Sequence, residues 1–450
     1  MVVAVIVCVA TAGLFTLRFV LRTDRGLQKP KTTNQAEGQV QLLFHKPPRT
    51  EQEVAALKKA ELGLAEQLMR DFQGNENSLM IMSNVLHRRG NAIEAVKFMN
   101  EALKINPNRA DAYATMGSLS FDEGKFEQAI TQYRKALDIQ PQLPGAHSKI
   151  GHALMMLGRQ DEAIKALQEE TQISPSSGLA YFLLGQAYLQ QRQYQKAKEN
   201  YEVAIKIDPE HVNAYYGLAT VCAKVGDRDE AEIYSQRFKE LKAEARKAVK
   251  GRKVEYDDFA VTQKSAAVTY IKAGQLYQDA GELHEAEELL KRAAGLDPEN
   301  VVCFLGLASL YQKSGQPSKA LQMYKKIREI QPESPISYLM IGILSAHLKQ
   351  LDEAEEAFGK MITLAPKKSD GYRELARLYL KTGRNLRQAR QLAARAVALE
   401  ASAANYFVLA WACDLNGDTA GALPAIERAL ELEPDNANYL RLYKVIQQRN

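Results

Sequence analysis

Residues 110–143, ADAYATMGSLSFDEGKFEQAITQYRKALDIQPQL, carry the pattern that decides the fold. The next 34 residues, 144–177, repeat it as PGAHSKIGHALMMLGRQDEAIKALQEETQISPSS. In each copy a Gly is followed five residues later by an Ala, and a Pro comes twelve residues after that Ala. A fixed step of this length indicates a protein built from stacked structural repeats.

The same element recurs along most of the chain. The Gly-x-x-x-x-Ala pairs are Gly90/Ala95, Gly124/Ala129, Gly158/Ala163, Gly226/Ala231, Gly281/Ala286, Gly315/Ala320 and Gly417/Ala422. Eight of the 15 prolines lie at the matching position of a unit. Ten units of 34 residues then begin at residues 76, 110, 144, 178, 212, 267, 301, 335, 369 and 403. The phase breaks once, between the fifth and sixth units, so the units form two arrays of five.

Each unit is predicted to form two amphipathic helices. In the unit at residues 110–143, apolar or small residues recur at spacings of three and four on both sides of Gly124. Gly permits the turn conformation between the helices, and the terminal Pro ends the second helix. Small residues at positions 8 and 20 let the paired helices cross closely. Because one unit cannot bury its apolar face alone, stacking of units stabilises the array.

The period, the small-residue positions and the terminal Pro together resemble the tetratricopeptide repeat family. The resemblance covers about three quarters of the chain. It implies an all-α fold, a right-handed solenoid of antiparallel helix pairs, with first helices lining a concave groove and second helices on the convex side. Some units depart from the pattern: Arg192 and Lys349 replace the turn Gly, Gly383 to Ala389 holds one extra residue, and Glu170 occupies a usually small position.

The segments around the arrays complete the predicted organisation. We expect a capping helix over residues 50–75, arrays over 76–245 and 267–436, a basic helical insert over 246–266 and a C-terminal capping helix over 437–450. The basic seam within the insert consists of Arg246, Lys247, Lys250, Arg252 and Lys253. It is either a solvated helix face or a contact for anionic lipid or an acidic partner.

Residues 1–21 differ in kind from the rest, because Val2 to Leu17 carry no charge. Their length and apolar character favour an uncleaved, single-pass membrane anchor, with a cleaved signal peptide or a buried helix as alternatives. Residues 22–49 follow as a juxtamembrane linker. The Arg residues after the apolar run place the soluble part in the cytoplasm by the positive-inside rule. A start further upstream with added basic residues, or cleavage of the segment, would place it outside the cytoplasm, in the periplasm or secreted.

Composition and motifs argue against an enzyme. The net charge of the 450-residue chain is +5, which requires no nucleic acid as partner. Its content of hydrophobic and charged residues excludes the disordered class, and its four Cys exclude the disulfide-rich class. The four Cys are far apart and are predicted to be packing residues. No Gly-rich phosphate loop, HExxH or GxSxG motif is present. We therefore predict no catalytic residue, no metal site and no cofactor.

Protein binding is the class of function that remains. The resemblance implies which positions of each unit face the groove. The predicted partner-binding residues are Asn84, Lys149, His152, Met155, Met156, Phe182, Gln186, Leu189, Tyr216, Leu305, Arg373, Arg377 and Trp411. In the first array apolar residues predominate, and Met and aromatic side chains suit an adaptable apolar contact. In the second array Asp370, Glu374 and Lys381 join the two arginines in interrupting the apolar stripe. The family's carboxylate clamp is not matched, because Thr115, Gly145 and Lys149 occupy its positions.

We therefore expect a non-enzymatic, membrane-anchored scaffold that binds partner proteins or peptides in the groove. In an alternative interpretation, the chain is an assembly module that self-associates or docks on lipid through the basic seam. A further alternative for the apolar stripe is that neighbouring units or an internal segment cover part of it. The sequence does not determine the oligomeric state.

Overall fold

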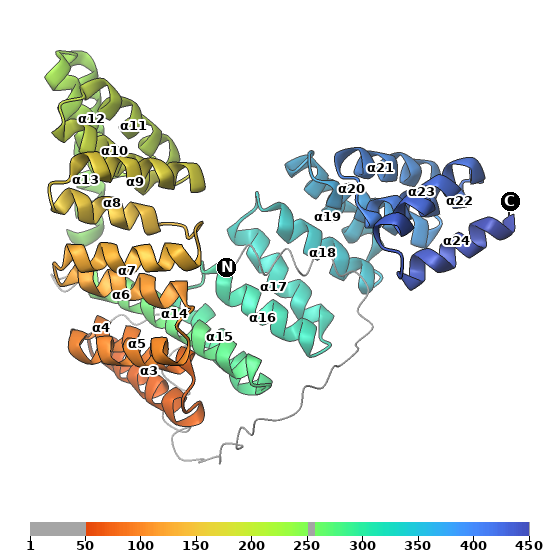
Figure 1. Cartoon of the computed structure of the whole chain (residues 1–450), viewed down its shortest axis with the longest axis horizontal. Helices are drawn as coiled ribbons and strands as arrows, with labels where there is room; N and C mark the ends of the chain where they lie inside the picture. The colour runs from red at the N-terminus through yellow and green to blue at the C-terminus, as the bar shows by residue number, and fades with distance from the viewer. Residues whose placement is uncertain (1–50, 251–256, 450) are drawn as a thin grey trace. The chain divides into compact units, whose positions relative to one another are not determined.

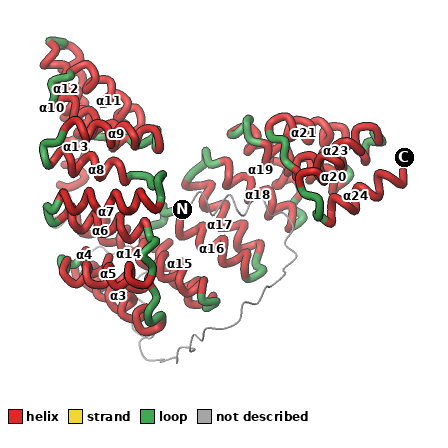
Figure 2. Tube along the Cα trace, in the orientation of Figure 1, coloured by secondary structure: helices red, strands yellow, loops and turns green. Residues whose placement is uncertain are grey.

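The computed structural model describes residues 51–250 and 257–449, without side chains for residues 51, 245–250 and 257–259. Every element in these ranges is an α-helix (Figures 1 and 2). The anchor predicted at residues 1–21 and the linker at 22–49 lie outside the described residues. Within the described ranges, no helix combines the length and hydropathy needed to cross a membrane.

The helices follow the predicted pairs. The first array consists of α4 (Glu76–Arg88), α5 (Ala92–Ile105), α6 (Ala110–Asp122), α7 (Phe126–Ile139), α8 (Ala146–Met156), α9 (Gln160–Ile173), α10 (Gly178–Gln190), α11 (Tyr194–Ile207), α12 (Val212–Val225) and α13 (Arg228–Lys250). The second consists of α14 (Asp257–Asp279), α15 (Leu283–Leu296), α16 (Val301–Lys313), α17 (Pro317–Ile330), α18 (Pro335–His347), α19 (Leu351–Leu364), α20 (Ser369–Thr382), α21 (Leu386–Leu399), α22 (Ala403–Leu415) and α23 (Thr419–Leu432). The flanking helices are α3 (Glu51–Asp71) and α24 (Ala437–Arg449).

The turn between paired helices requires a left-handed backbone, and most units supply Gly there. The two units without this Gly keep the same turn, because Arg192 and Lys349 adopt φ values of 60° and 63°. In the ninth unit the one-residue insertion is accommodated by a second left-handed residue, Asn385, at φ 48°. The sequence departures therefore change the residue at the turn without removing the turn.

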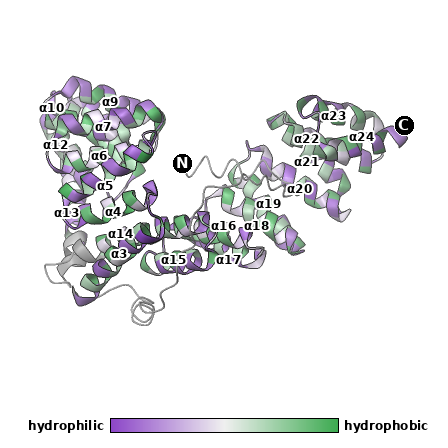
Figure 3. Ribbon diagram, turned by 60° about the horizontal axis from the view of Figure 1, so that its bottom comes forward, coloured by the Kyte–Doolittle hydropathy of each residue, from purple (hydrophilic) through white to green (hydrophobic). Residues whose placement is uncertain are grey.

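Close packing within a pair depends on a small residue in the first helix facing a large one in the second. The Tyr201 ring of α11 illustrates this, because it is fully buried between Gly185 of α10 and Gly217 of α12. A Cβ atom added to Gly185 would lie 2.6 Å from the ring, and one added to Gly217 would lie 2.5 Å from it. Figure 3 shows that the labelled helices carry both hydrophobic and hydrophilic residues, as amphipathic packing requires.

The N-terminal helix α3 does more than cover the first unit. It packs against α4, as expected for a cap, but also against α14, the first helix of the second array (Figure 1). One hydrophobic cluster accordingly includes Leu57 and Leu68 of α3, Val85 of α4 and Tyr270 of α14. The helix that precedes α14 in sequence, α13, packs mainly on α12. The two arrays are thus joined through α3 and through a direct contact between α4 and α14.

Polar contacts reinforce this joint. Glu61 of α3 is buried, with 4% of its surface exposed, and it forms an ion pair with Arg88 of α4. The hydroxyl of Thr269 on α14 donates to the Glu61 carboxylate at 2.7 Å and accepts from Arg88 at 2.8 Å. Near the end of α3, the Tyr277 hydroxyl donates to Asp71 at 2.5 Å. Such partners compensate for the hydration that a carboxylate loses on burial.

The predicted basic insert at residues 246–266 is divided between two helices. Helix α13 is described as far as Lys250. Helix α14 begins at Asp257, ten residues before the expected start of the sixth unit. Thr262 and Ala266 in this added part are buried, so the extension belongs to the packed structure.

Candidate partner-binding surface

The first helices of consecutive units lie on the inner side of the local curvature. Direct contacts join α8 to α10, α10 to α12, α14 to α16, α18 to α20 and α20 to α22. Second helices of the described units instead pack mainly on first helices. Because the first helices approach one another more closely, each array bends toward them, and their outward residues form what we call the first-helix surface.

Three large apolar side chains of the first-helix surface remain exposed in the first array. They are Met156 on α8, Leu179 on α10 and Tyr216 on α12, with 56%, 48% and 59% of their surfaces exposed. Lys149, another predicted groove residue, is also exposed on α8. Neighbouring units therefore leave part of the apolar stripe accessible to solvent.

Two histidine rings of the first array pack against phenylalanine rings. The ring of Phe182 lies 4.6 Å from that of His211, and the ring of Phe121 lies 4.9 Å from that of His152. Burial lowers the pKa of His152 below its ordinary value, and the nearby Lys149 adds to the effect. His152 thus serves as a largely neutral ring that packs against Phe121.

The other predicted groove residues of the first array are less exposed. Met155 and Leu189 are partly buried and pack against the cores of their own units. Phe182 also contacts the buried Tyr201 ring, at 6.0 Å between centroids. Asn84 and Gln186 are half-buried. The structure therefore separates exposed positions, suited to binding, from neighbours that also stabilise the fold.

The second array carries a row of charges along α20. Arg373 is buried and donates to Asp370 at 2.7 Å and to Glu374 at 3.0 Å, while Arg377 donates to both oxygens of Glu374 at 3.1 Å. Burial lowers the pKa of Arg373, but the carboxylates of Glu374 and Asp370 outweigh it and raise the pKa overall. Lys381 continues the row one turn beyond Arg377.

Apolar residues flank this row. Phe407 on α22 stacks on Tyr439 of α24, with centroids 4.9 Å apart, and lies 6.3 Å from Trp411. Trp411 and Phe407 also pack against the core formed by α20 and α22. Leu305, the remaining predicted groove residue, packs partly buried against the cluster that joins the arrays.

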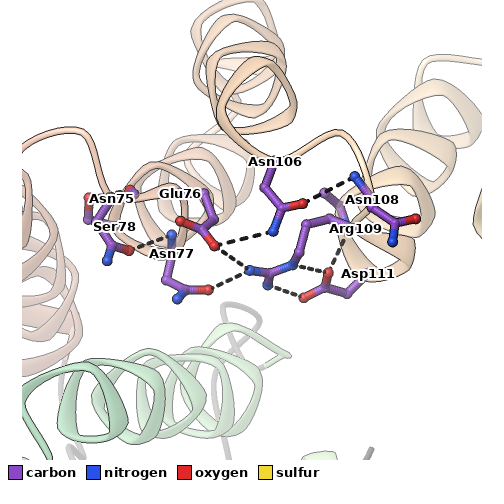
Figure 4. Close-up of polar contacts among 9 residues, drawn as sticks. Asn75, Glu76, Asn77, Ser78, Asn106, Asn108, Arg109 and Asp111 are labelled. Carbon is purple, nitrogen blue, oxygen red and sulfur yellow. Dashed lines mark hydrogen bonds and ion pairs between the residues drawn. The ribbon is translucent and has the colours of Figure 1, made fainter. Parts of the chain in front are cut away.

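A polar network connects the N-terminal ends of α4 and α6 (Figure 4). Arg109 pairs with Asp111 through two hydrogen bonds of 2.8 and 2.6 Å and donates to Asn77 at 2.9 Å. The bond with Asp111 raises the pKa of Arg109. Burial raises the pKa of Asp111, but Arg109 lowers it more, and Lys272 of α14 adds to the lowering. This network fixes the first two units relative to each other.

The remaining candidates are the basic seam and the cysteines. Of the basic seam, Arg252 and Lys253 lie outside the described residues, and the side chains of Arg246, Lys247 and Lys250 are not described. Burial raises the pKa of the Cys222 and Cys303 thiols to about 11, so both are inert packing groups. In the described part of the chain, no three His, Cys, Asp or Glu side chains are grouped to hold a metal ion.

Family models for the tetratricopeptide repeat match residues 77–109, 178–211, 277–340, 336–368 and 403–436, and a further model described as a TPR repeat matches residues 117–158. The chain therefore contains tetratricopeptide repeats, in both arrays. A comparison with curated proteins found no match.

Similar solved structures include two of MamA and one of Tom70. A crystal structure of MamA is 26% identical, with coverage of 37% of this chain and 97% of that one and a TM-score of 0.35. MamA 41-end from Desulfovibrio magneticus RS-1 is 25% identical, with coverage of 38% and 97% and a TM-score of 0.36. Yeast Tom70 is 16% identical, with coverage of 83% and 96% and a TM-score of 0.34.

Two roles were not predicted from the sequence. Glu170, noted only as a departure from the small-residue pattern, accepts hydrogen bonds from the Gly145 and Ser148 amides at 2.7 and 3.3 Å and so caps α8. Glu61, which joins the arrays, was not singled out at all. A signal was present, since Glu61 lies at helical spacing from Leu57, Leu64 and Leu68 on the apolar face of α3.

Proposed function

We propose that this chain is a non-enzymatic scaffold that binds partner proteins through its first-helix surface. The observation that carries the proposal is the exposure of Met156, Leu179 and Tyr216 on three consecutive first helices. Apolar side chains gathered on one face mark protein interaction sites more often than isolated exposed ones do. Tetratricopeptide repeats in both arrays support the same class of function.

The proposed ligand of the first array is a helix or an extended peptide with apolar anchors. Met156 is flexible and Tyr216 combines an apolar ring with a polar hydroxyl, so both adapt to a variety of side chains. The Tyr216 ring lies 5.4 Å from that of Phe238, which holds it in place on the surface. The aromatic–histidine contacts Phe182–His211 and Phe121–His152 give this part of the surface packed rings.

We further propose that residues 1–21 anchor the scaffold in a membrane, with the arrays in the cytoplasm. The uncharged run from Val2 to Leu17 and the arginines that follow it support this proposal. Fractionation of the full-length chain with and without residues 1–21 tests the anchor. An anchored chain stays in the membrane pellet at alkaline pH, and the deletion variant leaves it. Release of both, or digestion of the arrays by protease added to intact cells, would contradict the proposal.

Capture of partners from native membranes tests the first-helix surface. We expect the Met156→Asp/Tyr216→Asp variant to lose its partners by tenfold or more, because charge on an exposed apolar contact prevents burial of the partner. The matched control is Ile93→Asp/Ile233→Asp, which changes two exposed apolar side chains on the second helices α5 and α13. Circular dichroism checks that both variants stay folded.

These positions separate binding from folding better than Met155 and Phe182, which also pack against the core. Unchanged capture by the folded Met156→Asp/Tyr216→Asp variant would overturn the proposal. Loss of capture on reversing Lys247, Lys250 and Arg252 instead would favour the assembly module that acts through the basic seam.

A further inference from the structure

The charges along α20 are paired near its N-terminal end, whereas the lysine near its C-terminal end has no paired carboxylate. Positions 5, 9 and 13 of the ninth unit hold Arg373, Arg377 and Lys381, which lie at intervals of four residues on one helix face. Two carboxylates, those of Asp370 and Glu374, neutralise the two guanidinium groups. One positive charge, that of Lys381, is left over.

Lys381 has no hydrogen-bond or ion-pair partner in the described structure. The charge of Arg377 repels it, and the charge of Glu374, which attracts it, is already shared by Arg373 and Arg377. Burial lowers the pKa of Lys381, and Arg377 lowers it further. The side chain is exposed, so its ammonium is a donor that an incoming anion can reach and stabilise.

Apolar side chains lie on both sides of this donor, one unit away. Ile343 on α18 and Trp411 on α22 occupy position 9 of the eighth and tenth units, the position of Arg377 in the ninth. Leu415 occupies position 13 of the tenth unit, the position of Lys381. Ile343 and Leu415 are 36% and 38% exposed. Because α20 contacts both α18 and α22, Lys381 lies between two first helices that each expose an apolar side chain. On α18 that side chain, Ile343, lies one turn before the exposed His347, which holds position 13 of its unit.

The helix spacing fixes which peptide matches these side chains. Packed helices lie about 8–10 Å apart. An extended peptide advances about 3.3 Å per residue, so about three residues span one helix spacing. An acidic side chain over Lys381 then places residues three before and three after it over the exposed apolar side chains of α18 and α22.

We propose that the first-helix surface of α18, α20 and α22 binds an extended segment of a partner protein in which an Asp or Glu lies three residues from an apolar side chain on each side. The acidic side chain pairs with Lys381 beside Arg377, and the apolar side chains contact Ile343 on one side and Trp411 and Leu415 on the other. The flanking apolar side chains favour a polypeptide over a bare anion, because a bare anion leaves them exposed.

This inference rests on the proposed scaffold function and adds a second, chemically distinct site to it. The two are separable by experiment. The Met156→Asp/Tyr216→Asp variant changes only the first array, and the variants below change only the second.

The single tryptophan of the chain makes the test direct, since all tryptophan fluorescence comes from Trp411. The probe is the blocked peptide Leu-Ser-Ser-Glu-Ser-Ser-Leu, titrated into the full-length protein at low salt. We expect a saturable change in fluorescence. Replacing Glu by Gln in the peptide should weaken binding about tenfold, because the charge-assisted hydrogen bond is lost. Moving the Glu next to one Leu should weaken it similarly.

Protein variants complete the test. Lys381→Ala should weaken the Glu peptide about tenfold and leave the Gln peptide unchanged, whereas Lys381→Arg should retain binding. The matched control is Lys360→Ala, at an exposed lysine on the second helix α19. Trp411→Phe removes the signal, so calorimetry measures that variant.

Several results would overturn the proposal. Equal affinity for the Glu and Gln peptides would show an apolar contact without charge recognition. Equal affinity for the peptide with altered spacing would contradict the extended binding mode. Competition by millimolar inorganic phosphate, or an equal fluorescence change with vesicles containing phosphatidylserine, would assign Lys381 to a free anion or to lipid.

Discussion

Single residues that break the repeat pattern have identifiable structural roles. Glu170 is 1% exposed, and its carboxylate accepts from the Gly145 and Ser148 amides at the start of α8. A negative charge at a helix N-terminus satisfies free amides and interacts favourably with the helix dipole. We predict that Glu170→Ala lowers the stability by about 1–3 kcal/mol, since it leaves buried amides unpaired.

Thermal unfolding followed by circular dichroism measures this loss. Glu169→Ala is the matched control, because the Glu169 side chain is 60% exposed and its contact with His147 Nδ1 at 3.0 Å leaves it open to solvent. Equal unfolding temperatures for the two variants would show that Glu170 does not cap α8.

His152 makes stability depend on pH. Burial lowers its folded pKa below the unfolded value of 6.5, so the folded state prefers the neutral ring. Its contribution is fully present above pH 6.5 and is lost as the pH falls through the lowered folded pKa. We predict that the unfolding temperature falls more between pH 7.5 and 5.5 in the unchanged protein than in His152→Gln, which cannot titrate. Parallel curves for the two proteins would contradict this assignment.

At the scale of the helix pair, the fit between small and large residues limits substitution. Gly185→Ala adds a helix-favouring residue, but its Cβ would lie 2.6 Å from the Tyr201 ring. We predict a loss of about 1–3 kcal/mol from overpacking, larger than the gain of about 1 kcal/mol in helix propensity. Gly63→Ala in α3 is the matched control, because nothing lies within 4 Å of its added Cβ, and it should be neutral or stabilising.

Combining Gly185→Ala with Tyr201→Leu tests the cause. The smaller side chain gives the added methyl group space, so the double variant should lose less than the sum of the two single changes. Urea unfolding of all four proteins measures this coupling. Additive losses would show that the Gly185 contact with the ring is not the source of the effect.

The helix pairs were predictable because their determinants are local. The 34-residue period, the turn Gly and the terminal Pro act within a unit, and both arrays follow them. The candidate surface was predictable only by position. Met155 and Met156 are adjacent in sequence, yet Met155 packs inward and Met156 is exposed, since a helix turns about 100° per residue. The joint between the arrays was not predictable from the period, because it pairs Glu61 with Thr269, 208 residues away.

For the two arrays together, α3 is the decisive element. It packs against both α4 and α14, which also contact each other. Its contacts with the second array include the hydrogen bond between the buried Glu61 and Thr269, which Arg88 of α4 joins, and the Tyr277–Asp71 hydrogen bond. The covalent connection between the arrays is therefore not required to hold them together. We predict that a chain cut at a protease site inserted after Gly251 keeps both halves in one complex at micromolar concentration.

Size-exclusion chromatography with light scattering measures the association of the cut halves. Glu61→Arg should weaken it at least tenfold, because Arg88 would then face a like charge in a partly buried position. Glu66→Arg, at an exposed position of the same helix, is the matched control. If the unchanged halves separate as soon as the chain is cut, α3 does not join the arrays, and the covalent connection alone accounts for their association. If they separate only in Glu61→Arg, the joint depends on the buried Glu61 carboxylate that interrupts the apolar face of α3.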